Sequence, residues 1–291
     1  MSVEEQFIRN VDKLVPCPRV ALEVLQHAHE PHCDLATLEA TIERDPNLTA
    51  TMLRMANSAY YGHMHQIHSV REIVIRLGVD AIKIIAITGA SVACLRSPQI
   101  AYNLEPGALW RHSHATAILA AILARHARET EPAAVYTAAL LHDIGKVLLN
   151  RPLQQEAGRR GPDAAGKPSG VAWERSVLGT DHARVGKALL ADWGLPTAIV
   201  DPVGSHHDRP GIVTAPLASR IVFAANAVVE SIGIHGLTTQ IPPPLDEMAT
   251  AQEDWSFLPG FQEGMEAIID EFFGEYMKTS SLFAEHGHSA S

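Results

Sequence analysis

The sequence predicts an all-α protein of 291 residues, and three observations carry that prediction. Aromatic residues make up only 5% of the chain, whereas alanine, leucine and isoleucine are abundant, a composition typical of helices rather than sheets. Apolar residues recur at the three- and four-residue spacing of a helix face, and several such runs begin with an N-capping residue. No alternating apolar and polar pattern persists long enough to indicate a strand. We therefore expect helices throughout the chain.

The first hundred residues predict a bundle of short helices. Asp45 directly precedes Pro46, which is the order expected of an N-cap followed by a proline in the first helical turn. Gly78 stands where a helix end is expected, and a long apolar helix should follow over residues 81–95. Together these helices predict an N-terminal helical subdomain over residues 7–104.

Glu105-Pro106 opens a second helical unit, which we expect to cover residues 105–235. Its expected helices lie, in chain order, from residue 109 to near residue 131 and at residues 133–149, 182–193, 196–207 and 220–229. Residues 151–170 contain three prolines and four glycines, which predicts a surface loop. The remaining residues 236–291 are expected to hold one helix, over 260–277, and a flexible, frayed tail.

Charge and cysteine content limit the function classes. A net charge of −10 argues against binding to a nucleic-acid backbone, and no run of lysine or arginine indicates a local basic patch. The three cysteines are scattered and form no C-x-x-C pair, which is typical of free thiols in a reducing compartment. The N-terminus lacks a signal-peptide pattern, and no uninterrupted apolar stretch is long enough to span a bilayer. We therefore expect a soluble cytoplasmic protein that binds neither nucleic acid nor membrane.

The residues that most strongly indicate chemistry are His142 and Asp143, which adjoin inside an expected apolar helix. A buried aspartate is costly unless it is paired or binds a cation. Further histidines lie on or beside the apolar faces of other expected helices. We predict that the following residues converge on one divalent metal: His112, His142, Asp143, His182, His206 and His207. On a helix, Lys146 shares a face with the pair, so it should either ion-pair with Asp143 or contact a phosphate near the metal.

Mixed histidine and carboxylate ligation suits iron, manganese, zinc or nickel, without selecting one of them. A bound metal can acidify a water molecule for phosphoester cleavage. Plainer alternatives stay open from the residues alone: His142-Asp143 as a helix-end hydrogen bond, His182 as a core histidine, and His206-His207 as an exposed helix end. His114 should face away from the cluster, because it lies only two residues after His112.

Several segments together resemble the HDOD family. The most specific is the block from Asp45-Pro46-Asn47-Leu48 to Ala56-Asn57-Ser58-Ala59, and the resemblance covers roughly residues 7–235. It continues through Leu77-Gly78, Leu109-Trp110-Arg111-His112-Ser113, Leu140-Leu141-His142-Asp143-Ile144-Gly145, His182-Ala183-Arg184-Val185-Gly186, Trp193-Gly194-Leu195-Pro196 and His206-His207. HDOD proteins are bacterial signalling proteins, generally regarded as regulatory and related to HD and HD-GYP phosphohydrolases. The resemblance implies an HD-domain-like helical bundle preceded by an N-terminal helical subdomain.

The resemblance to catalytic HD-GYP domains also implies roles for individual residues. These residues fall at metal ligands of those domains: His112, His142, Asp143, His182, His206 and His207. Lys146 falls at their lysine. Asn226 falls where they supply a final aspartate, and it is a weak ligand because an amide offers a carbonyl oxygen without charge. Their Gly-Tyr-Pro segment is replaced here by Asp208-Arg209-Pro210-Gly211-Ile212.

These implications favour a regulatory signal-transduction module that acts through protein–protein contacts and does not catalyse a reaction. Its expected partners are signalling proteins of two-component, chemotaxis or cyclic-di-GMP circuits. The alternative hypothesis is a metal-dependent phosphohydrolase acting on a nucleotide or another phosphoester. The sequence leaves the partner, the input signal, the identity of the metal and the oligomeric state open.

Overall fold

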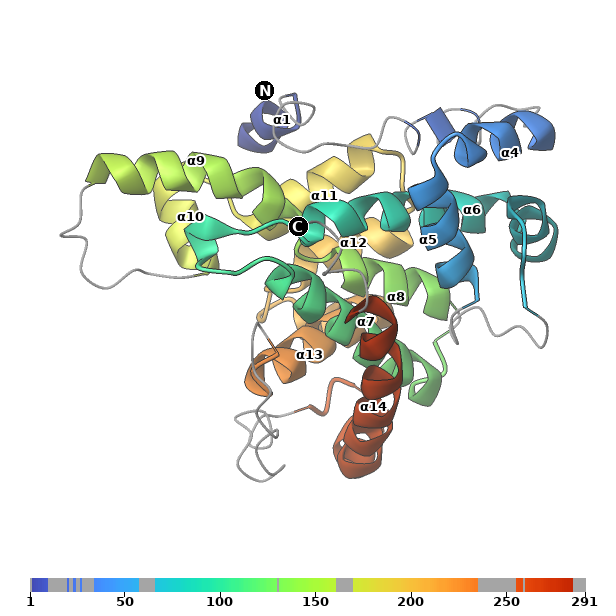
Figure 1. Cartoon of the computed structure of the whole chain (residues 1–291). Coiled ribbons are helices and arrows are strands. Elements are labelled where there is room, and N and C mark those ends of the chain that lie inside the picture. Colours follow the sequence, from blue (N-terminus) through green and yellow to red (C-terminus); the bar gives the residue numbers. More distant parts are fainter. Residues whose placement is uncertain are drawn as a thin grey trace.

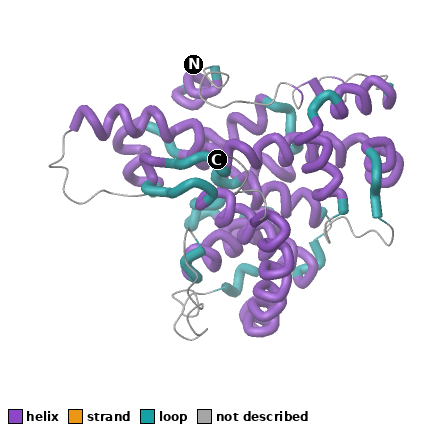
Figure 2. The backbone as a smooth tube through the Cα atoms, in the orientation of Figure 1, coloured by secondary structure: helices purple, strands orange, loops and turns teal. Residues whose placement is uncertain are grey.

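The computed structural model describes residues 2–9, 20, 23–24, 27, 34–57, 66–129, 131–160, 170–234, 255–258 and 260–284. Across these ranges the regular structure is helical, and extended backbone pairs only in an isolated bridge between Gln99 and Leu104 (Figure 2). The expected all-α fold class is therefore confirmed. Among the described helices, none combines the length and the apolar character that crossing a membrane requires.

The N-terminal part contains α1 (Val3–Ile8), α4 (Leu35–Glu43), α5 (Pro46–Ala56) and α6 (Val70–Leu95) (Figure 1). Asp45 caps α5, because its carboxylate accepts hydrogen bonds from the backbone amides of Asn47 and Leu48. Gly78 interrupts α6 with a φ of 85°, a conformation that favours glycine. The predicted cap and the predicted helix end are both confirmed. Residues 58–65, which include the end of the Ala-Asn-Ser block, lie outside the described residues.

The rest of the chain forms α7 (Ala108–His126), α8 (Pro132–Leu141), α9 (Ile144–Arg160), α10 (Val171–Leu178), α11 (His182–Asp192), α12 (Thr197–Ser205), α13 (Leu217–Ser231) and α14 (Phe261–Ala284). Short 3-10 turns occur at Ile100–Tyr102 and Ile212–Thr214. Helix α7 lies at the centre of this part, with α8, α13 and α14 packed against it (Figure 1). Because residues of α7 are buried along most of its length, it forms the axis of the bundle.

The structure has two helices where one continuous helix was expected over residues 133–149, so this prediction was wrong. Helix α8 ends at Leu141 and α9 begins at Ile144, so the His-Asp pair lies at a junction between two helices. The His142 ring helps to end α8, because its Nδ1 donates a hydrogen bond to the Ala139 carbonyl oxygen at 2.6 Å. That carbonyl belongs to the last turn of the helix, where backbone acceptors lack partners within the helix.

The surface loop expected over residues 151–170 is also partly wrong. Helix α9 continues to Arg160 with Pro152 inside it, while residues 161–169 lie outside the described residues. Pro152 cannot donate a backbone hydrogen bond to the preceding turn. Leu153 next to it is fully buried in the core, so tertiary packing offsets the lost hydrogen bond and the helix persists.

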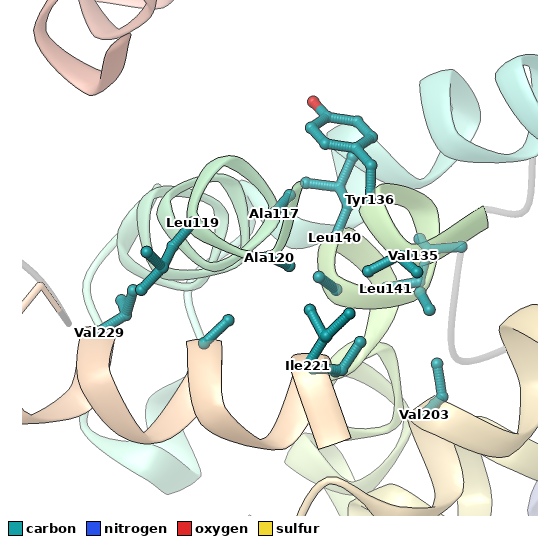
Figure 3. Close-up of a cluster of buried hydrophobic side chains, with 14 of the residues drawn as sticks. Ala117, Leu119, Ala120, Val135, Tyr136, Leu140, Leu141, Val203, Ile221 and Val229 are labelled. Carbon is teal, nitrogen blue, oxygen red and sulfur yellow. The ribbon is translucent and has the colours of Figure 1, made fainter. Parts of the chain in front are cut away.

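Two clusters of buried apolar side chains form the interior. The smaller cluster uses residues between 24 and 86, and the larger uses residues between 94 and 272. Figure 3 shows Ala117 and Ala120 of α7 in the larger cluster with side chains of α8, α12 and α13. Helix α6 contributes to both, since Ile82 and Ile85 belong to the smaller cluster and Leu95 to the larger. The proposed domain boundaries stay predictions.

Candidate metal centre

The predicted ligands come from α7, the α8–α9 junction, the start of α11 and the end of α12: His112, His142, Asp143, His182, His206 and His207. His207 is partly exposed, whereas each of the others is at most 5% exposed. Their ligand atoms form two groups, and within each group all atoms lie within 4.8 Å of one another. The structure thus brings the six side chains together, and their role as ligands stays a prediction.

Asp143 belongs to both groups, because its two carboxylate oxygens face different histidines. Its Oδ1 lies 3.2 Å from His182 Nε2 and 3.8 Å from His206 Nε2. Its Oδ2 lies 3.4 Å from His142 Nε2 and 3.8 Å from His112 Nε2. We call the first group the Oδ1 side (His182, His206 and His207) and the second the Oδ2 side (His112 and His142); Lys146, which contacts Oδ2, also lies on the Oδ2 side.

Lys146 occupies part of the Oδ2 side. Its Nζ lies 2.7 Å from Asp143 Oδ2, and its side chain is 16% exposed. Of the two roles predicted for this lysine, the ion pair is the one present in the structure. Burial by itself would raise the pKa of the Asp143 carboxyl, but the facing His142 and Lys146 hold that pKa well below its usual range. Asp143 is therefore ionised at neutral pH.

The proton positions on two histidines follow from their backbone partners. His142 Nδ1 lies 2.6 Å from the Ala139 carbonyl oxygen, and His206 Nδ1 lies 2.6 Å from the Val203 carbonyl oxygen. A carbonyl oxygen can only accept, so each Nδ1 carries a proton and donates it. In the neutral ring the other nitrogen, Nε2, then presents a lone pair. Both lone pairs face the Asp143 carboxylate, which is the orientation that metal-binding histidines adopt.

His182 is the centre of the Oδ1 side. Its Nε2 lies 3.3 Å from His206 Nε2 and 3.0 Å from His207 Nε2. Burial lowers the pKa of His206 to about 4 and also lowers the pKa of His207, so both rings are neutral at neutral pH. Burial and Lys146 oppose protonation of His182, but hydrogen bonds with Asp143 and Glu174 raise its pKa. His182 can therefore carry an additional proton. That proton would occupy the position facing Asp143, His206 and His207 that a metal cation would otherwise take.

Asn226, on α13, is not aligned with the Oδ1 side but pairs with His112. Its Oδ1 lies 2.9 Å from His112 Nε2, and its Nδ2 donates to Glu230 Oε1 at 3.5 Å. With the amide in this orientation, His112 Nε2 donates a hydrogen bond to Asn226 Oδ1. Asn226 therefore contacts the cluster through His112, and its role as a ligand stays a prediction.

Gly145 allows the elements of the site to approach each other. A Cβ at this position would collide with the backbone carbonyl of His182 and would crowd the backbone nitrogen of Gly186, both on α11. Only glycine avoids that collision, so α9 and α11 pack with their backbones in close contact. The close approach places His182 beside Asp143, two residues before Gly145.

Sequence reasoning missed Glu174, which is completely buried on α10. Both of its carboxylate oxygens lie 2.8 Å from His182 Nδ1, and Oε2 also accepts from the His182 backbone amide at 2.7 Å. No motif marks this glutamate, because its contact depends on how α10 packs before α11. His114, in contrast, behaves as expected: it belongs to neither ligand group and stacks on Trp110 with ring centroids 5.3 Å apart.

The residues present fit a divalent transition metal. His142 Nε2 is buried and has no hydrogen-bond partner among the residues that the structure describes. A buried lone pair without a partner is costly, and a cation would satisfy it. The donor set of imidazole nitrogens and one carboxylate suits iron, manganese, zinc or nickel better than calcium or magnesium.

The helical bundle and its buried histidine–aspartate cluster define a protein of the HD-related helical class. The chain belongs to the HDOD family, because the HDOD domain matches residues 14–209. An uncharacterised protein of Treponema pallidum (strain Nichols) is 26% identical over 247 residues, which cover 81% of this chain and 46% of that protein. The chain therefore spans about half the length of this curated relative.

Two solved structures have a similar fold. A Shewanella amazonensis SB2B protein, provisionally described as a phosphohydrolase, is 21% identical with a TM-score of 0.68; the match covers 96% of this chain and 98% of that one. An HDOD domain protein of unknown function from Geobacter sulfurreducens is 24% identical with a TM-score of 0.64, over 97% of this chain and 96% of that one. At these identities the likeness shows the fold alone.

Proposed function

We propose that this chain is a regulatory HDOD module that holds a divalent transition metal and acts through protein–protein contacts rather than by turnover. The observation that carries the proposal is the asymmetry around Asp143. The Oδ1 side offers imidazole nitrogens only, whereas the Oδ2 side contains an ammonium group and a histidine already paired with Asn226. Such a cluster can bind a cation at Oδ1 while the second half of a catalytic centre stays blocked.

Within the two ligand groups found among the described residues, Asp143 is the single carboxylate, and this composition supports a regulatory role. A divalent metal supplies Lewis acidity and lowers the pKa of a bound water. Catalysis would further require this chain's residues to orient a phosphoester, and Lys146 is the cation placed to do so. Its Nζ is engaged with Asp143 at 2.7 Å instead. The sequence also carries Asp208-Arg209-Pro210-Gly211-Ile212 where catalytic HD-GYP domains have their Gly-Tyr-Pro segment.

The proposed partners are bacterial signalling proteins of two-component, chemotaxis or cyclic-di-GMP circuits, and the proposed compartment is the cytoplasm. Membership of the HDOD family supports this assignment, and the net charge of −10 disfavours nucleic acid as a partner. Co-purification from cells that express the tag-free chain should recover such proteins. A chain in which His142 and Asp143 are both replaced by alanine should recover fewer of them if the metal centre controls the interaction.

A second candidate function is metal-dependent phosphoester hydrolysis, and one observation favours it. Lys146 and His207 are the partly exposed members of the cluster, so the cluster has an edge at which a phosphate could meet a lysine. The similar Shewanella amazonensis structure is provisionally described as a phosphohydrolase. Hydrolysis would require Lys146 to leave Asp143 and contact the phosphate.

One experiment separates the two candidates. The tag-free chain is analysed for bound metal and assayed with bis(4-nitrophenyl) phosphate and cyclic di-GMP. A variant with both His142→Ala and Asp143→Ala is compared with His68→Ala, which removes an exposed histidine outside the cluster. We expect stoichiometric metal in the wild type and in His68→Ala, none in the double variant, and no turnover in any of them. Turnover that disappears in the double variant alone would establish the hydrolase, and absence of metal from all three would refute the metal centre.

A further inference from the structure

Glu174 is a buried carboxylate that forms three close contacts with a single histidine, His182. Its side chain lies on α10, is 0% exposed, and contacts both the ring Nδ1 and the backbone amide of His182. A buried carboxylate loses its hydration, so it persists only where the protein provides strong hydrogen bonds in return. The Glu174 carboxylate therefore lies against the Nδ1 edge of His182, on the side away from the Nε2 that faces Asp143.

His182 needs an acceptor from outside its own helix, and the reason is its position. His142 and His206 each donate Nδ1 to a carbonyl three residues earlier, Ala139 and Val203, at the ends of α8 and α12. His182 is instead the first residue of α11, so no preceding helical turn supplies such a carbonyl. Its backbone amide also lacks a partner within the helix, as first-turn amides do. Glu174 supplies an acceptor for both groups.

We propose that Glu174 is a positioning residue of the metal centre: it holds the proton of His182 on Nδ1 and fixes the ring so that Nε2 points toward Asp143, His206 and His207. This inference rests on the proposed metal-binding function. A carboxylate that accepts from the second nitrogen of a ligand histidine fixes its tautomer and makes its lone pair more basic. A backbone carbonyl fixes the tautomer without adding charge, so His182 is the histidine most strongly biased toward binding a cation.

The segment between Glu174 and His182 is held in place by contacts of its own. Gly179 has a φ of 73° and reverses the chain direction after α10, where glycine is favoured. Asp181 caps α11 by accepting from the Arg184 amide and forms an ion pair with Arg175 at 2.7 Å. Thr180 donates to Glu4 of α1 at 2.6 Å. With the turn fixed in this way, the carboxylate of Glu174 cannot follow His182 if the ring rotates.

The test compares Glu174→Gln and Glu174→Ala with the wild type and with His182→Ala. The first readout needs no metal: long-range proton–nitrogen NMR of the metal-free chain reports which nitrogen of His182 carries the proton. We expect Nδ1 protonation in the wild type and in Glu174→Gln, whose amide oxygen still accepts, and loss of this preference in Glu174→Ala. An unchanged His182 tautomer in Glu174→Ala would overturn the proposal.

The second readout is the dissociation constant for Zn²⁺, measured by competition with a chelator. We expect affinity to fall about 10- to 100-fold in Glu174→Ala, with a smaller loss in Glu174→Gln because the charge alone is removed. Wild-type affinity in Glu174→Ala, alongside weak binding by His182→Ala, would refute the role of Glu174 and leave the metal centre standing. If Zn²⁺ bound the wild type no more tightly than it binds His182→Ala, the metal centre itself would fail at this histidine. If Glu174→Ala does not fold, Glu174→Gln decides the affinity question, since unchanged affinity there contradicts the charge effect.

Discussion

The two sides of Asp143 are built from similar residues but are prepared for different occupants. On the Oδ1 side, the carboxylate meets His182 and His206, whose Nδ1 protons are held by Glu174 and a backbone carbonyl. On the Oδ2 side, it meets Lys146 at 2.7 Å, so a cation belonging to the chain is already present. A complete set of ligand residues therefore does not define a complete site, because protons and ion pairs decide which lone pairs are available.

Replacing Gly145 should disrupt both sides of Asp143 at once. Gly145→Ala places a Cβ against the His182 backbone, which cannot give way as a flexible side chain could. We expect a loss of about 3 kcal/mol or more in unfolding free energy, at the upper end for overpacking, together with loss of metal binding. Gly274→Ala on α14 is the matched control, because its Cβ meets nothing within 4 Å. Equal denaturant midpoints for the two variants would contradict the close packing of α9 and α11.

Changing the pH should alter metal affinity mainly through His182 on the Oδ1 side. The pKa of His182 is raised despite burial, so a metal must displace its proton at and below neutral pH. Protonation of His182 stabilises the metal-free fold below the unfolded pKa of about 6.5, and this contribution disappears as pH rises through the higher folded pKa. Zn²⁺ affinity should therefore fall by up to about tenfold per pH unit on acidification. Thermal shifts caused by Zn²⁺ should grow between pH 6 and pH 8, and a constant shift would count against this proton.

Removing the Lys146 ammonium group should make the Oδ2 side resemble the Oδ1 side in its capacity to bind a metal. In Lys146→Met the aliphatic stem is retained while the ammonium next to Asp143 Oδ2 is lost. We expect Zn²⁺ to bind about tenfold more tightly, equivalent to about 1.4 kcal/mol, because the carboxylate is no longer neutralised. Lys187→Met, which removes an exposed lysine paired with Asp201, serves as the control. Calorimetric titration that finds equal affinities in both variants would show that Lys146 does not compete with a metal.

Placing a carboxylate beside His112 should change metal binding only slightly. Asn226→Asp replaces the amide that accepts from His112 Nε2 with an anion on the Oδ2 side. We expect a gain of a few-fold in affinity for a second metal equivalent, since a charged oxygen is the stronger ligand. Asn47→Asp, an exposed change at the start of α5, keeps the net charge of the two variants equal. The prediction fails if metal analysis gives the same stoichiometry for both.

The local features of the fold could be predicted from sequence because they depend on neighbours in the chain. Asp45 and Gly78 act as cap and interruption through their own backbone geometry. The break at His142-Asp143 could not be predicted in this way, since apolar residues continue on both sides of it. It arises from a ring-to-carbonyl hydrogen bond and from the contact of Gly145 with α11. Both depend on tertiary structure, which local propensity does not contain.

The candidate site shows the same division. The histidines and Asp143 could be found because their residue types suggest chemistry even before their distances are known. Glu174 and the pairing of Asn226 with His112 could not, because a glutamate on a short helix and an asparagine in an apolar helix are common. Their meaning comes from contacts between α10 and α11 and between α7 and α13. Sequence reasoning therefore named Asn226 without its contact to His112 and left Glu174 out.

Helix α6 connects the two hydrophobic cores. The part after Gly78 begins in the smaller core with Ile82 and Ile85 and ends in the larger core with Leu95. A helix of a few turns resists bending, so this part of α6 is a stiff connection between the two cores. Helix α6 also packs against α7, α8 and α9. Helix α7 carries His112 and α8 ends directly before His142, so the helix that joins the two cores also contacts the elements that hold the cluster.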